Sequence, residues 1–144
     1  KSQLFKNSVV DVLTPEHYKL LYFISKHSRL AEKATDKERW IRYLHIMVLV
    51  YEAILAGVFD YDYSPYGEEV GSKRMMLNIS QEARDNLDDL VEAGMVRSLR
   101  MSTSNGKSTM AYQPSKKGLE YMRQGSISRE DKELCDEFMY DPRG

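Results

Sequence analysis

The chain has 144 residues, of which 42% are hydrophobic and 30% charged, and its formal net charge is −1. These values are typical of one soluble globular domain; they exclude a disordered chain and leave too little sequence for two full domains. The most apolar run, Tyr43–Tyr51, has nine residues, whereas a membrane-spanning helix needs roughly 20, so we expect a buried helix and no membrane segment. The only cysteine, Cys135, excludes an intrachain disulfide and favours an intracellular location of unspecified compartment. Because residue 1 is Lys rather than Met, we expect a fragment or a processed product.

The first predicted element is an N-terminal helix over residues 14–34. Thr14 is a suitable N-cap residue, and Pro15 suits the first helical position because that position needs no backbone N–H. The spacing of the following residues predicts one buried face, formed by Leu20, Phe23, Ile24, His27 and Ala31.

A second helix is predicted from Thr35 to Gly57. Thr35 and Glu38 have the spacing of a capping box, and Gly57 is a natural C-terminal stop. The helix is apolar nearly all round from Leu44 to Leu55, so several other elements or a second subunit must cover it. A homodimer through Trp40–Leu55 is therefore one expected assembly.

Residues 59–71, FDYDYSPYGEEVG, hold four carboxylates and three tyrosines. We expect an acidic loop here, followed by a short strand over residues 73–80. A calcium loop starting at Asp60 would have Pro65 where the turn needs glycine and Gly71 where a bidentate glutamate is needed, which argues against calcium. The loop tyrosines would offer a protein partner aromatic contact area at low entropic cost; they are Tyr61, Tyr63 and Tyr66. The alternative is that the same tyrosines pack within the fold.

The second half of the chain predicts a helix, a hairpin and two more helices. Ser80 is a suitable cap for a helix that ends at Gly94. Residues 95–115 have the pattern of a β-hairpin, in which Asn105–Gly106 is the dipeptide best suited to a tight turn with positive φ. Ser115 and Ser128 are suitable caps for two further helices.

The segment from Leu87 onward resembles the back half of a winged helix-turn-helix domain, as found in MarR-like and PadR-like regulators. The resemblance rests on a helix ending in L-x-x-L-x-x-x-G-M-V (Leu87–Val96), a hairpin wing, and a Y-x-x-S-x-K-G exit (Tyr112–Gly118) into another helix. It implies an α+β fold, mostly helical, with a winged-helix-like core over residues 35–125. The N-terminal helix of residues 14–34 and a C-terminal helix and tail of residues 126–144 would flank this core within a single domain.

The chain departs from this family in two ways. A family member would usually carry a complete helix between Gly57 and Ser80, where this chain has the tyrosine-rich loop and a strand. The helix of residues 80–94, which would read DNA, carries one cation, Arg84, against five carboxylates: Glu82, Asp85, Asp88, Asp89 and Glu92. Because DNA readers approach phosphates with Lys and Arg, these carboxylates work against DNA binding. We expect Asp85, Asp88, Asp89 and Glu92 to contact a protein partner instead.

The predicted wing and exit helix form the basic part of the chain, with Arg97, Arg100, Lys107, Lys116 and Lys117. These cations would contact phosphates if the chain binds nucleic acid. The alternative is that Lys and Arg on a hairpin edge deter pairing with other strands. They would also attract the acidic face of a second copy.

No catalytic signature is present, because the sequence has no G-x-S-x-G, phosphate loop or dinucleotide fingerprint. His17, His27 and His45 lack the spacing of a metal site, and His45 lies within the apolar run, where a buried structural role is expected. The acidic neighbours of Cys135 disfavour a thiolate nucleophile. We expect no enzyme activity, no metal and no cofactor.

The sequence thus predicts a non-catalytic interaction module on a winged-helix scaffold, which binds a protein partner through the acidic helix and the tyrosine-rich loop. The alternative is a nucleic-acid-binding regulator that contacts phosphates through its basic wing.

Overall fold

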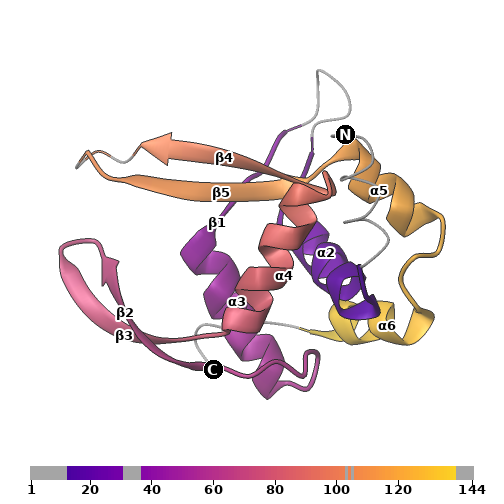
Figure 1. Ribbon diagram of the computed structural model, residues 1–144, viewed down its shortest axis with the longest axis horizontal. Helices are drawn as coiled ribbons and strands as arrows, with labels where there is room; N and C mark the ends of the chain where they lie inside the picture. The colour runs from indigo at the N-terminus through magenta and orange to yellow at the C-terminus, as the bar shows by residue number, and fades with distance from the viewer. Residues whose placement is uncertain (1–12, 31–36, 103, 105, 139–144) are drawn as a thin grey trace.

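The computed structural model describes residues 13–30, 37–102, 104 and 106–138. Within these residues, five helices and two antiparallel sheets form an α+β fold (Figure 1). In chain order the elements are α2 (Pro15–His27), β1 (Ile41–Arg42), α3 (Tyr43–Leu55), β2 (Ser64–Val70), β3 (Lys73–Ile79), α4 (Gln81–Glu92), β4 (Val96–Ser102), β5 (Ser108–Pro114), α5 (Lys116–Arg123) and α6 (Arg129–Glu137). None of the helices in these ranges is long and apolar enough to span a membrane.

Helix α2 begins as the sequence predicts. The Thr14 side chain accepts a hydrogen bond from the His17 backbone N–H, and His17 Nδ1 accepts one from the Thr14 backbone N–H at 2.9 Å. A histidine therefore completes a capping box at the position where glutamate or glutamine is usual. The predicted face residues Leu20, Phe23 and Ile24 are buried, as expected.

The same helix ends at His27, earlier than the predicted residue 34. Ser28 is extended, and Arg29 then pairs with Arg39 in an isolated antiparallel bridge. This bridge draws the chain away from the helix axis, so the helix cannot continue. The predicted face residue Ala31 lies outside the described residues.

Helix α3 is shorter than the predicted helix of residues 35–57. Ile41–Arg42 form strand β1, in which Ile41 lies opposite Tyr112 of β5, and α3 begins only at Tyr43. Burial of Ile41 and the pairing with β5 outweigh local helix propensity here. The expected cap, Thr35, lies outside the described residues. The predicted stop is confirmed, since Gly57 follows the helix with a φ of +83°.

The apolar surface of α3 is covered on one side by the rest of the chain. Its buried residues are Ile46, Met47, Leu49, Val50 and Ala53. His45 and Leu55 are exposed, so the expected buried role of His45 is wrong: it points away from the elements that cover the helix. The homodimer through Trp40–Leu55 stays a prediction.

The prediction of a loop over residues 59–71 is wrong in its second half. Ser64–Val70 form strand β2, which pairs with β3 along its whole length. Gly71 and Ser72 connect the strands in a two-residue turn, and Gly71 has a φ of +65°, as the first position of a tight hairpin turn favours. Pro65 is tolerated because both strands of a two-stranded sheet are edge strands.

The hairpin β4–β5 and the three serine caps are confirmed. Strand β5 lies between β1 and β4 in a three-stranded sheet. Gly106 has a φ of +81° at the tip of the hairpin, whereas Asn105 lies outside the described residues. Ser80, Ser115 and Ser128 cap α4, α5 and α6, and each side chain accepts the backbone N–H of the third residue after it.

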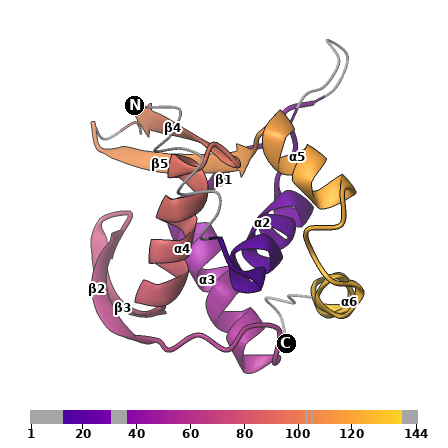
Figure 2. The ribbon, with the colours of Figure 1, turned by 45° about the vertical axis from the view of Figure 1, so that its right-hand side comes forward.

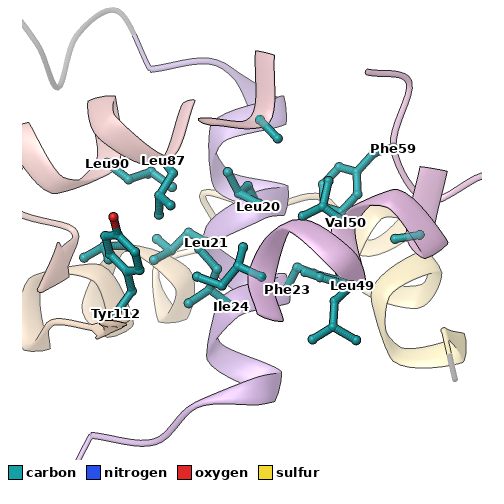
Figure 3. Packing of buried hydrophobic residues seen from close by; sticks show 14 of the residues in the cluster. Leu20, Leu21, Phe23, Ile24, Leu49, Val50, Phe59, Leu87, Leu90 and Tyr112 are labelled. Atoms are coloured by element: carbon teal, nitrogen blue, oxygen red, sulfur yellow. The ribbon is translucent and has the colours of Figure 1, made fainter. Parts of the chain in front are cut away.

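The core lies around α2, between α3, α4 and the base of β5 (Figure 3). Leu20, Leu21 and Ile24 of α2 pack in one cluster with Leu87 and Leu90 of α4. The two hairpins project from the same side of α4, and α5 and α6 lie on the opposite side (Figure 2). The core therefore supports two arms, and these arms position the candidate site.

Candidate functional site

The hairpin β2–β3 carries a group of exposed apolar side chains. They are Tyr66, Val70, Met75 and Met76, whose exposed fractions are 41%, 40%, 46% and 67%. Cross-strand partners share a face of the hairpin, and the pairs Tyr66 with Leu77, Glu68 with Met75 and Val70 with Lys73 place Tyr66, Val70 and Met75 on one face. The same face reaches the buried Ile79 at the base of the hairpin. We name Tyr66, Val70 and Met75 the hairpin patch; Met76, opposite Gly67, lies on the other face of the hairpin.

The structure separates the three tyrosines that the sequence grouped. Tyr61 is only 6% exposed; it stacks on Phe59, and its hydroxyl accepts a hydrogen bond from the Asn86 side chain at 2.9 Å. Burial raises the pKa of Tyr61. Its predicted role as contact area for a partner is therefore corrected, because Tyr61 is a core residue. Tyr63 and Tyr66 are exposed, and Tyr63 packs edge-on against Tyr51.

The acidic residues of α4 divide into those with intramolecular partners and those without. Asp89 Oδ2 accepts a hydrogen bond from His17 Nε2 at 2.9 Å, which links α4 to α2. Asp85 accepts one from the Gln81 side chain at 3.0 Å. In the described part of the chain, Asp88 and Glu92 have no ion pair or hydrogen bond from another side chain, and both line a groove.

This groove lies between α4 and the inner face of β4–β5, and has a volume of about 610 Å³. The residues that line it are Tyr43, Arg84, Asp88, Val91, Glu92, Ser98, Arg100, Ser108, Thr109, Met110 and Tyr112. It thus combines charged groups of both signs, hydroxyls and two phenols with the apolar side chains of Val91 and Met110. A volume of this size is in the range of known binding pockets.

The cations in the groove have contacts of their own. The Arg84 guanidinium lies over the ring of Tyr43, 5.6 Å from its centroid, and Arg100 donates a hydrogen bond to Ser108 Oγ at 3.2 Å. Burial and then the charge of Asp88 raise the pKa of Tyr112, and burial also raises the pKa of Tyr43. Both phenols are therefore protonated at neutral pH.

Most of the predicted phosphate-binding cations have intramolecular partners. Arg97 donates to Gln113 Oε1 at 2.8 Å and lies over the ring of Trp40. Lys107 pairs with Glu69 of β2, so the tips of the two hairpins touch. Lys117 donates to the Ala93 carbonyl oxygen at 3.0 Å, and Arg100 binds Ser108 as described above. Lys116 is exposed at the start of α5. The structure therefore spreads these cations over several local contacts and does not gather them at one site.

The remaining titratable candidates are structural. His17 links the α2 cap to Asp89, and the pKa of His27 is lowered because that ring is partly buried. Burial raises the pKa of Cys135 to about 12, so its thiol stays protonated. Among the described residues, no group of three or more His, Cys, Asp and Glu side chains could hold a metal ion.

Sequence reasoning missed the exposed methionines of β3, Met75 and Met76, and the groove residue Tyr43. A signal for the methionines was present: neighbouring residues of a strand face opposite sides, so Met75 and Met76 cannot both face the core. The pattern V-G-S-K at Val70–Lys73 also fits a two-residue hairpin turn. Nothing near Tyr43 in the sequence indicates its place beside α4.

The model of the Uncharacterized protein MJ1567 family matches residues 16–144 of this chain. A comparison with curated proteins found no match.

Proposed function

The chain belongs to the Uncharacterized protein MJ1567 family, and we propose that it is a non-catalytic module that binds a protein partner. The hairpin patch is the contact surface, and the groove beside α4 adds polar contacts.

The observation that carries this proposal is the exposure of the hairpin patch. Its three apolar side chains share one face of an arm that contacts the rest of the fold mainly through β3 and α3. Groups of exposed apolar residues with polar neighbours often mark interaction sites, and Tyr and Met are enriched in interfaces. The neighbouring Glu68 and Glu69 keep such a surface in water when no partner is bound.

The scaffold under this surface is proposed to be a winged helix. Helix α4, the hairpin β4–β5 and helix α5 occur in the order, and with the Gly94 turn and Ser115 cap, that the sequence resemblance implied. The hairpin β2–β3 is inserted immediately before α4, next to the helix that such domains use for DNA reading. Together with the carboxylates of α4, this insertion favours protein over DNA at that helix.

Pull-down with the immobilised chain tests the proposal. We expect the double variant Met75→Ser and Met76→Ser to lose the proteins that the unchanged chain retains from an extract, because it removes apolar contact area from the arm. The matched control is Leu99→Ser with Leu134→Ser, which removes two exposed leucines on β4 and α6. Recovery of the same proteins by the hairpin variant, or equal loss with the control, would contradict the proposal.

Nucleic-acid binding is the second candidate, and the exposed cations of β4 and α5 are the observation that favours it. Titration against duplex DNA, single-stranded DNA and RNA at low and near-physiological salt tests it. Binding that weakens steeply with salt, and weakens further when Arg97 and Lys107 are replaced by alanine, would support it. Absence of binding at low salt would contradict this second candidate and leave protein binding as the one remaining proposal.

A further inference from the structure

We propose that the partner presents a basic amphipathic segment, whose Lys or Arg side chain enters the groove beside Asp88 and Glu92 and whose apolar residues cover the hairpin patch. This inference rests on the proposed protein-binding function and adds the chemistry of the partner.

The floor of the groove is one stripe along α4. Arg84, Asp88 and Glu92 are spaced four residues apart, so they lie on one face of the helix, each about 6 Å further along its axis. Arg84 and Asp88 are four residues apart, a spacing at which a helix allows an ion pair. The Arg84 guanidinium stacks on Tyr43 instead. On the opposite wall, Arg100 binds Ser108 rather than a carboxylate. The two carboxylates of the stripe are thus left for a cation from outside.

The walls around these carboxylates also suit a cation. Tyr112 and Tyr43 are close enough to Asp88 for its charge to raise the pKa of both phenols, and a protonated phenol keeps a neutral ring. Aromatic rings attract ammonium and guanidinium groups through their faces, and concave walls strengthen the field of the carboxylates. An ammonium or guanidinium group between Asp88 and Tyr112 would therefore have both charged and aromatic contacts.

The hairpin patch continues this surface with apolar contacts. Glu68, which shares a face of the hairpin with Tyr66 and Met75, is close enough to Tyr43 for its charge to raise the pKa of that phenol. The face with Tyr66 and Met75 is therefore turned towards the groove. Methionine side chains adapt to varied apolar shapes, as a surface that receives a peptide segment requires.

The charge around this surface selects the partner. The segment Phe59–Gly71 has four carboxylates and no Lys or Arg, and α4 adds five carboxylates against Arg84. Lys73 and Arg74 offset only part of this charge. Charge complementarity therefore favours a cationic partner and disfavours an acidic peptide, a nucleic acid or an anionic membrane.

Labelled model peptides of about 16 residues, long enough for an isolated helix, provide the test. Two peptides combine Leu with Lys, one with helical and one with alternating spacing, and two have Glu in place of Lys. Binding to the full chain is measured by fluorescence anisotropy at low and near-physiological salt. We expect at least one Lys peptide to bind about tenfold more tightly than its Glu counterpart, because close charge pairs contribute energies of this size.

Two double variants locate the binding. Asp88→Asn with Glu92→Gln should weaken Lys-peptide binding about tenfold. The control, Glu130→Gln with Glu137→Gln, makes the same charge change on the exposed face of α6 and should have little effect. Equal effects of the two variants, or equal binding of Lys and Glu peptides, would overturn the inference.

Failure of this inference differs from failure of the proposed function. If Glu peptides bind as well as Lys peptides and Met75→Ser with Met76→Ser abolishes both, the hairpin patch binds protein but the charge inference is wrong. If no peptide binds and the pull-down is also unaffected by the methionine variant, both fail. Sedimentation measures whether the chain self-associates. If it does, and the methionine variant removes the self-association, a second copy of the chain occupies the surface and the inference of a basic partner is overturned.

Discussion

Two hairpins with strands of equal length leave the same side of α4, but they relate to the core in different ways. The hairpin β4–β5 is joined by β1, and four consecutive residues at the end of β5, Ala111–Pro114, are buried. In the part of the chain that the structure describes, the hairpin β2–β3 has no third strand, and only Ile79 at its base is buried. One hairpin is therefore part of the core, and the other is an arm.

The comparison shows that apolar residues stabilise the core in one hairpin and stay exposed in the other. In β4–β5, the apolar residues near the base pack on α2 and α4. In β2–β3, the side chains of Met75 and Met76 remain exposed to water and add little to stability. A two-stranded sheet on its own is only marginally stable. Under the proposed function, these exposed residues contact a partner.

The largest expected difference between the hairpins is in amide hydrogen exchange. The amides of β5 should exchange through global unfolding, which typically costs about 5–15 kcal/mol. The amides of β2 should exchange through local opening that costs several kcal/mol less, because little core must separate. Exchange followed by NMR or mass spectrometry measures both. Equal protection of β2 and β5 would remove the distinction between core and arm.

The second prediction compares a truncation in the core that supports β4–β5 with a truncation on the hairpin β2–β3. Leu87→Ala removes a fully buried side chain of α4 and should lower the free energy of unfolding by about 2–5 kcal/mol. Met76→Ala removes an exposed side chain and should change it by less than about 0.5 kcal/mol. Urea denaturation measures both variants. A large loss for Met76→Ala would show that the arm packs on the fold and is not available to a partner.

The third prediction uses two glycines. A Cβ on Gly118 would lie 2.2 Å from the Met95 carbonyl oxygen, so Gly118→Ala should destabilise by about 2 kcal/mol, although alanine favours helices. A Cβ on Gly67 would meet only the end of the Arg74 side chain, which can move, so Gly67→Ala should cost less than about 1 kcal/mol. Thermal melting of both variants measures these two costs. Equal costs would contradict the closer packing at the base of β4–β5.

The smallest expected effect concerns the contact between the two tips. The hydrogen bond and charge of Lys107 lower the pKa of Glu69. Because the folded pKa lies below the unfolded value, the contact is complete above the unfolded pKa and is lost as pH falls through the folded pKa. Lys107→Gln should therefore raise the Glu69 pKa, as measured by carboxyl ¹³C NMR titration. Lys116→Gln, on α5, is the control and should leave it unchanged; an unshifted pKa in Lys107→Gln would mean that the tips do not touch in solution.

The fold was predictable where local chemistry dominates. Ser80, Ser115 and Ser128 cap their helices because a side-chain oxygen satisfies a backbone N–H only three residues away. Gly57 and Gly94 end helices because glycine accepts a positive φ. These signals need no distant partner, and each was read correctly.

The site was less predictable. Tyr61 and Tyr66 are five residues apart in similar acidic surroundings, yet one is in the core beside Phe59 and the other is on the arm. Asp88 and Asp89 are neighbours, but His17, 72 residues from Asp89, binds only one of them. Exposure and pairing of this kind depend on which distant residues the fold brings near.

The sequence by itself determined the class of the fold, the helix caps, the second hairpin and the acidic character of α4, because composition, period and turn chemistry are local properties. Only the tertiary structure decided that Ile41–Arg42 form a strand, that β3 has β2 as its partner, and that Tyr66, Val70 and Met75 share one exposed face. The physical reason is that burial and strand pairing are set by contacts between distant segments, whose free energy outweighs the local preferences of either segment alone.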